Sequence, residues 1–152
     1  MQALNLPKTD LKIIIKEEKQ LVFDILRRKF VALTPEEWVR QLFVHHLIRD
    51  KGYPAECIGN EISLTLNGTR KRCDSVVYDQ NAQPAMIIEY KSPDVEITQQ
   101  VFDQISRYNI KLRVKWLVVS NGVHHYCCHV DYDSGTCQFV EDIPPYSDIR
   151  EG

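Results

Sequence analysis

Glycine is scarce in this sequence, and its six glycines stand apart from one another. No glycine-rich loop is available to cradle a nucleotide phosphate, which excludes a nucleotide-driven motor within these residues. The Gly-x-Ser-x-Gly elbow of serine hydrolases and the signatures of cysteine proteases are also missing. No apolar run approaches the roughly 18 residues of a membrane span, and the first residues lack the layout of a signal peptide. We therefore expect neither a membrane contact nor a leader.

Neither sign of charge dominates, because 19 lysines and arginines face 21 acidic residues and the net charge is −2. Such a chain is not a general binder of polyanions, so contact with nucleic acid has to come from local patches. The five cysteines form an odd set, scattered through strand-like segments. This usage favours reduced thiols and predicts a cytoplasmic location.

Residues 1–152 are long enough for one domain with a real core, and no repeat or linker divides them. We predict an N-terminal β extension (1–32), a core (33–140) and a tail (141–152). Thr34 is a suitable helix N-cap, Pro35 suits the first helical position, and Glu37 completes a capping box. Hydrophobic patterns and turn signals predict a hairpin at 11–15 and 21–25, strands at 29–32, 57–66, 71–78, 85–90, 116–120, 123–131 and 136–140, and helices at 34–50 and 98–111. The fold class is α/β (α+β): a mixed central sheet flanked by helices.

An acid pair followed by a lysine is the most informative pattern of the chain. Asp74 lies in one predicted strand, and Glu89-Tyr90-Lys91 ends the next one. If these strands pair as a hairpin, two carboxylates and an ammonium meet at one point, with Glu89 and Lys91 on the same face. Mg²⁺ prefers carboxylate oxygens and retains several waters, and this combination suits phosphodiester hydrolysis. The alternative is a set of solvated charges at strand ends.

The order of these motifs resembles the nuclease core of the PD-(D/E)xK superfamily. The residues that carry the resemblance are Glu36, Asp74, Glu89-x-Lys91 and Gln104-x-x-x-Tyr108. More narrowly, residues 33–41, 71–74 and 87–91 resemble the N-terminal nuclease-like domain of type I restriction endonuclease R subunits. The likeness covers about residues 20 to 130 and implies an αβββαβ core and Mg²⁺-dependent (or Mn²⁺-dependent) DNA cleavage. Cys73 stands where the motif's name has proline, a position at which the superfamily often lacks proline.

The resemblance also implies roles for individual residues. Asp74 and Glu89 would be metal ligands, and Lys91 would assist the nucleophile or stabilise the charged phosphate. The first helix often adds an acid to such a site; we favour Glu36, because Glu37 already has a local task as capping-box partner. Its alternative role is that of a first-turn acid favoured by the helix dipole.

Gln104 and Tyr108 stand one helical turn apart on the same face. In related nucleases this pair orients the site or contacts the DNA backbone. The alternative is a core tyrosine beside a surface glutamine.

Basic residues flank the predicted site, among them Lys71, Arg72 and Arg107. They would suit a rim that tracks DNA phosphates, although ordinary solvated surface explains them equally well. A second cluster, residues 124–129, is rich in histidine and cysteine, but its spacing lacks the two separated ligand pairs of a zinc site. Half-buried strand residues explain that cluster more simply.

The leading prediction is therefore a metal-dependent DNA endonuclease domain, and a part in a restriction-modification system follows from the resemblance. The alternatives are a non-catalytic module of the same fold that binds nucleic acid or serves assembly, and a small zinc-binding interaction domain. R subunits carry an ATP-driven motor after this domain, and these residues contain none. The resemblance thus implies that the chain works alone, forms a homo-oligomer, or docks onto separate motor or specificity subunits.

Overall fold

The computed structural model describes residues 3–152. Six strands form the central sheet, in the order β4-β5-β6-β7-β8-β9. Their bounds are β4 (Ile58–Leu66), β5 (Thr69–Tyr78), β6 (Pro84–Tyr90), β7 (Trp116–Ser120), β8 (His125–Asp131) and β9 (Thr136–Val140). Only β6 and β7 run parallel, because helix α2 (Gln99–Ile110) connects them, and the other neighbours are antiparallel. The predicted mixed sheet is confirmed.

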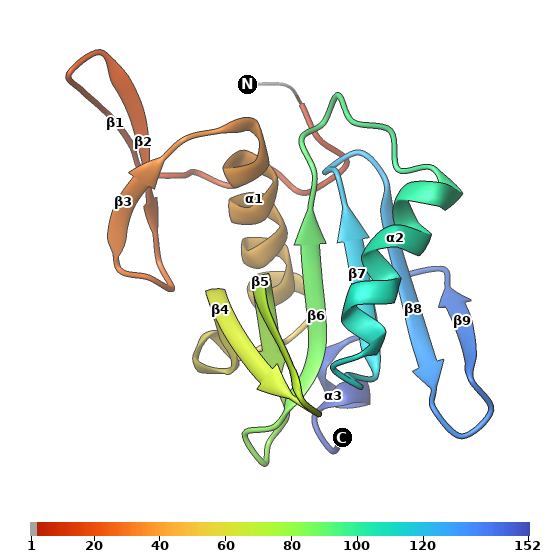
Figure 1. The fold of residues 1–152 in the computed structure, drawn as a ribbon. Helices are drawn as coiled ribbons and strands as arrows, with labels where there is room; N and C mark the ends of the chain where they lie inside the picture. Colours follow the sequence, from red (N-terminus) through yellow and green to blue (C-terminus); the bar gives the residue numbers. More distant parts are fainter. Residues whose placement is uncertain (1–2) are drawn as a thin grey trace.

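Helices cover both faces of this sheet (Figure 1). Helix α1 (Pro35–Asp50) packs Val39, Phe43 and Leu47 against one face, and α2 packs Phe102 against the other. Side chains alternate along β6, so that Met86, Ile88 and Tyr90 join the α1 core, and Ile87 joins the α2 core. The sheet is therefore buried on both sides at its centre, and polar groups there need partners.

The start of α1 follows the expected cap only in part. Thr34 Oγ1 accepts a hydrogen bond from the Glu37 amide at 3.0 Å, and Pro35 occupies the first turn. The Glu37 carboxylate, however, does not return to the Thr34 amide, which donates to the Ala32 carbonyl. The capping box is thus formed on one side only. Farther along the helix, His46 is half-buried.

The N-terminal β-hairpin of the expected fold class is confirmed, within residues 13–32. β1 (Ile13–Lys16), β2 (Lys19–Asp24) and β3 (Lys29–Ala32) form a separate antiparallel sheet in that order. This N-terminal sheet projects from the body beside α1 (Figure 1). It is anchored by Val22 and Asp24, which are buried, and Asp24 accepts a hydrogen bond from Asn60 of β4 at 2.9 Å.

The last residues contribute to the core, which nothing in their pattern had indicated. Ile143, Tyr146 and Ile149 are buried with the α1 core, the latter two on the short helix α3 (Tyr146–Ile149). A 3-10 turn, η1 (Ala55–Cys57), leads into β4. Within residues 3–152, no helix is long and apolar enough to cross a membrane.

Candidate active site

Strands β5 and β6 bring the predicted acid pair together. They pair antiparallel with Ser75 opposite Ile88, so Asp74 and Glu89 lie one residue beyond this pair on adjacent strands. Asp74 Oδ2 accepts a hydrogen bond from the Tyr90 amide at 2.9 Å, which fixes its carboxylate against β6. The expected adjacency of the two segments is confirmed.

A cavity of about 440 Å³ opens at this point of the sheet. The two acids line it together with Lys91, and Glu36 reaches it from the first turn of α1. Helix α2, which packs on the other face of the sheet from α1, adds Gln104 and Tyr108 to the cavity wall. One cavity therefore collects all six residues of the predicted site, although they come from two strands and two helices.

Glu89 is the buried acid of this cavity. Its side chain is 12% exposed. Burial, and then the negative charge of Asp74, raise the pKa of Glu89 to about 7, against the opposing attraction of Lys71. A cation between the two carboxylates would reduce their mutual repulsion and so stabilise their charged forms.

Lys71 provides such a positive charge in the structure. Its Nζ donates to Glu89 Oε1, forming a partly buried ion pair. Sequence reasoning placed Lys71 on an outer rim, whereas the structure directs it into the cavity. Of the other two rim candidates, Arg72 is exposed and pairs with Glu61 at 2.8 Å, and Arg107 is exposed on α2.

Lys91 is held by its backbone just after β6 ends. Its amide donates to the Ser120 carbonyl at the end of β7, at 2.8 Å. This bond continues the parallel pairing of β6 with β7 by one residue. The backbone position of Lys91 is thus fixed by the sheet, while its side chain reaches the cavity.

A buried ion network supports the site from the α1 side. Arg40 Nη2 and Nε bind the Glu37 carboxylate at 2.7 and 2.9 Å, and its Nη1 donates to the Asp74 carbonyl at 2.8 Å. Pairing of β4 with β5 skips one position here, from Asn60–Ser75 to Ile62–Cys73. The Asp74 carbonyl, which lies at this gap in the pairing, is therefore bound by Arg40.

Glu37 has more partners than a capping role requires. Gln41 Nε2 and Arg27 also donate to it, at 3.0 and 2.7 Å. Burial alone would raise the pKa of Glu37, but hydrogen bonds from Arg40 and Gln41 outweigh burial and keep that pKa below its usual value. The i, i+3 spacing of Glu37 and Arg40 was a visible signal of this pair, and sequence reasoning missed it.

The helix residues are less enclosed than the acid pair. Glu36 and Gln104 are exposed, and Tyr108 is 57% exposed. The alternative of a core tyrosine at position 108 is therefore wrong, and the buried polar residue of that helix turn is Asn109. An exposed tyrosine beside a glutamine at a cavity mouth is available to a ligand.

The donor set fits a hard divalent cation with few protein ligands. Asp74 and Glu89 supply carboxylate oxygens, as Mg²⁺ prefers, and such a cation keeps several waters. Within residues 3–152, no three His, Cys, Asp or Glu side chains form a ready-made metal cluster. Glu36 thus lines the cavity without completing a three-ligand site, and its role as a ligand remains a prediction.

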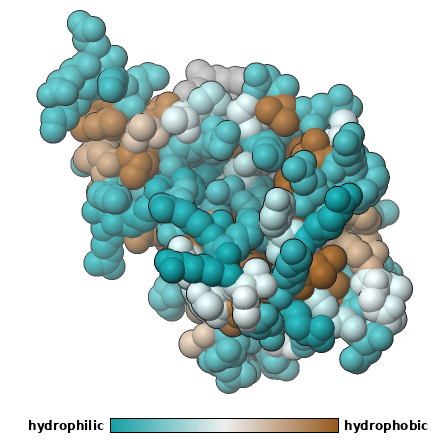
Figure 2. Space-filling model, viewed as in Figure 1, coloured by the Kyte–Doolittle hydropathy of each residue, from teal (hydrophilic) through white to brown (hydrophobic). Residues whose placement is uncertain are grey.

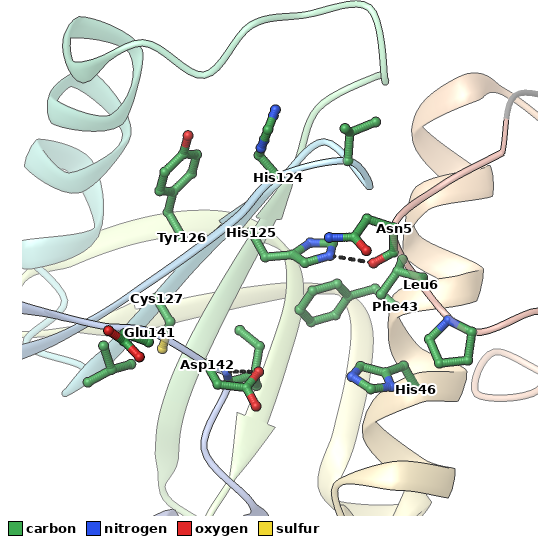
Figure 3. Close-up of a pocket in the computed structure, with 14 residues that line it drawn as sticks. Asn5, Leu6, Phe43, His46, His124, His125, Tyr126, Cys127, Glu141 and Asp142 are labelled. Carbon is green, nitrogen blue, oxygen red and sulfur yellow. Dashed lines mark hydrogen bonds between the residues drawn. The ribbon is translucent and has the colours of Figure 1, made fainter.

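The histidine and cysteine segment lines a second cavity, of about 420 Å³ (Figure 3). His125 points towards Asn5, and its Nε2 lies 2.9 Å from the Asn5 carbonyl oxygen. Its Nδ1 lies 2.7 Å from Ser120 Oγ, so both ring nitrogens are engaged. Burial raises the pKa of Cys127 to about 12, which opposes the thiolate that zinc requires. Cys127 and Cys128 are buried, His125 and His129 are half-buried, and His124 is exposed, as expected for a partly buried strand.

Comparison with known proteins adds the family. Residues 35–144 match the family described as type I restriction enzyme R protein N terminus. The chain belongs to this family. All six residues of the predicted site fall inside the matched range, whereas α3 and the N-terminal sheet lie outside it.

A solved structure shares the fold of this R-protein N-terminal domain. It is a fragment of a putative HsdR subunit of a type I restriction enzyme from Vibrio vulnificus YJ016, 20% identical, with a TM-score of 0.56. The similarity covers 80% of this chain and 25% of that chain, so this chain spans a quarter of that structure's length. Among curated proteins, no match is found.

Proposed function

We propose that the domain is a metal-dependent endonuclease of the PD-(D/E)xK type that hydrolyses DNA phosphodiester bonds as part of a restriction system. The observation that carries this proposal is the convergence of Asp74, Glu89 and Lys91 in one cavity. Family membership supports it, because the family is that of an R-protein N terminus. Mg²⁺ or Mn²⁺, when bound by the two carboxylates, would supply a Lewis acid that activates water and offsets phosphate charge.

The residues of the chain would bind and orient the substrate. A water oxygen forms the new bond to phosphorus and releases a proton to solvent, the bond to one sugar oxygen breaks, and that oxygen takes up a proton from solvent. The Lys91 ammonium would donate hydrogen bonds to the phosphate oxygens as their charge grows. Gln104 and Tyr108, exposed at the mouth, would hold the DNA backbone beside the acids. DNA and separate motor or specificity subunits are the partners that we propose.

Plasmid cleavage tests this function. Purified protein should nick supercoiled plasmid with Mg²⁺ or Mn²⁺, and EDTA should abolish nicking. Lys91→Ala should remove most turnover while Mn²⁺ binding, measured by calorimetry, largely persists. Asp74→Ala should remove both, because it deletes an oxygen donor. Arg49→Ala, an exposed change on the far end of α1, is the control and should leave both intact.

Two results would contradict the proposal. Cleavage that persists in Lys91→Ala would leave the activity without the residue assigned to it. If the wild type cleaves no form of DNA, with or without motor subunits, a non-catalytic module of the same fold becomes the better description.

A further inference from the structure

The N-terminal sheet carries a basic face that the candidate active site does not use. The register of β1 with β2 places Lys16 opposite Lys19, and the Phe23 amide donates to the Lys12 carbonyl at 2.9 Å. Phe23 lies opposite Phe30 of β3. Paired residues share a face, so these five residues form one surface, here called the lysine face. The half-buried pair of Ile14 and Leu21 lies on the same face, between the lysine pair and Phe23.

The opposite side of the same sheet packs on the body at its base, while Ile13 and Ile15 farther along that side are exposed. Val22 and Asp24 alternate with the residues of the lysine face, and both are buried. The lysine face therefore points to solvent, and its three lysines are exposed. Figure 2 shows the projecting part of the molecule as hydrophilic at its tip, with hydrophobic atoms below.

Charge distinguishes this segment from the remainder of the chain. Residues 1–32 contain seven basic and four acidic residues, whereas the whole chain has 19 against 21. One of the four acids, Asp24, is buried and paired with Arg27. The pairing of Lys16 with Lys19 places like charges opposite each other, which costs stability, although the exposed Glu17 and Glu18 of the turn between them offset part of that cost. A polyanion lying on this face would remove that cost.

The aromatic rings of the lysine face are not open to stacking. Phe23 and Phe30 pack edge to face, with centroids 5.3 Å apart. Lys12 Nζ lies 6.0 Å and 5.6 Å from the two centroids. Binding of single strands relies on bases stacked on free rings. A face that offers lysines above occupied rings suits phosphates instead, as a duplex presents them.

The base of this sheet lies next to the candidate active site along the chain. β3 ends at Ala32, α1 begins at Pro35, and Glu36 lines the cavity. The ribbon shows the N-terminal sheet extending outward from the start of α1 (Figure 1). The N-terminal sheet therefore begins a few residues from the cavity wall.

We propose that the lysine face binds the phosphate backbone of duplex DNA beside the cleavage site. The choice of DNA as ligand rests on the proposed function. The contacts are electrostatic and independent of sequence, and they position the duplex without reading bases. The face thereby extends the contact made at the cavity.

The test compares two triple variants in equilibrium binding. Lys12→Ser, Lys16→Ser and Lys19→Ser together remove the charge of the lysine face. Arg49→Ser, Lys111→Ser and Arg150→Ser together make the same change of charge on exposed residues outside the sheet. Fluorescence anisotropy with a labelled 30-base-pair duplex is measured in EDTA, which prevents cleavage, from 50 to 300 mM KCl. Urea unfolding verifies that both variants remain folded.

The salt dependence is the decisive quantity. Each lost phosphate contact flattens the slope of log K against log salt by about 0.9 for duplex DNA, so the lysine-face variant should lose about 2 to 3. Its affinity at 50 mM KCl should fall tenfold or more, and the control variant should keep the wild-type slope.

Equal losses in both variants would reduce the effect to net charge and overturn the proposal. A loss confined to a labelled single strand would overturn the choice of duplex, and absence of duplex binding by the wild type would overturn it outright. Because binding is measured without metal, a protein that binds as expected but never cleaves would refute only the proposed nuclease.

Discussion

Glu89 should reduce the stability of the folded domain at neutral and alkaline pH, and Glu89→Gln should restore it. In the folded state the pKa of Glu89 rises to about 7, while 4.5 is its usual value. A tenfold change in proton affinity corresponds to about 1.4 kcal/mol, so ionising Glu89 in the fold costs about 3 kcal/mol. That figure already contains the opposing attraction of Lys71.

The sign of the pH dependence follows from the raised pKa. Between about pH 4.5 and 7 the folded protein binds more protons at Glu89 than the unfolded chain does, so stability falls as pH rises. The stabilising contribution of the protonated form is complete below pH 4.5 and is lost through pH 7. Glutamine resembles the protonated acid, so the variant should match the wild type near pH 4 and exceed it by up to about 3 kcal/mol at pH 8.

Urea unfolding in EDTA at half-unit steps from pH 4 to 9, followed by tryptophan fluorescence, measures this difference. Subtracting the wild type from the variant cancels the other titrations. Glu56→Gln, on an exposed residue, is the control and should change stability by only a few tenths of a kcal/mol at any pH. A difference that stays flat with pH, or a Gln variant that is less stable at pH 8, would refute the reasoning that Glu89 is a crowded, buried charge.

Three further outcomes follow from the packing. Arg40→Met should lower the free energy of unfolding by about 3–5 kcal/mol in urea titration, because it leaves the buried Glu37 carboxylate without its main partner; a loss below 1 kcal/mol would contradict the buried network. Gly122→Ala should cost about 1–2 kcal/mol, since φ is +86°, a left-handed backbone conformation that alanine adopts only with strain; an unchanged melting temperature would contradict this strain. All five thiols are free, and only Cys137 is exposed, so Ellman's reagent should titrate one thiol rapidly in the folded protein and five in urea.

Local signals were sufficient to predict most of the fold. Thr34 and Pro35 located the start of α1, and the apolar run before Glu89 located β6, because caps and buried strands leave marks within a few residues. The N-terminal hairpin was predicted, and the strand after it joined it as a third member. The packing of α3 was not predictable, because the partners of Tyr146 are distant in the sequence. Its hydroxyl donates to the Tyr78 carbonyl and its amide to the Lys51 carbonyl.

The candidate site was predicted as a set of residues, but not as a network. The spacing of the two residues was enough to predict that Asp74 lies near Glu89, because two strands joined by a short turn usually pair antiparallel. The orientation of Lys71 towards Glu89 was not visible, because a lysine side chain can follow several directions from the same backbone position. The task of Glu37 was misassigned for two reasons. Its i, i+3 spacing from Arg40 was a local signal that was overlooked, and Arg27 becomes its partner only when the N-terminal sheet packs on α1.

The burial of α3 has a consequence for the order in which the chain is made. Helix α1 leaves the ribosome before α3, but buried Tyr53 depends on the Pro144 carbonyl and the Tyr146 ring, which follow it by more than 90 residues. Until those residues emerge, a nascent chain would expose part of its apolar interior and depend on chaperones. A fragment that ends at residue 144, where the family match ends, lacks α3 and would keep part of this apolar interior exposed. We expect that fragment to aggregate under conditions in which the 152-residue chain stays in solution.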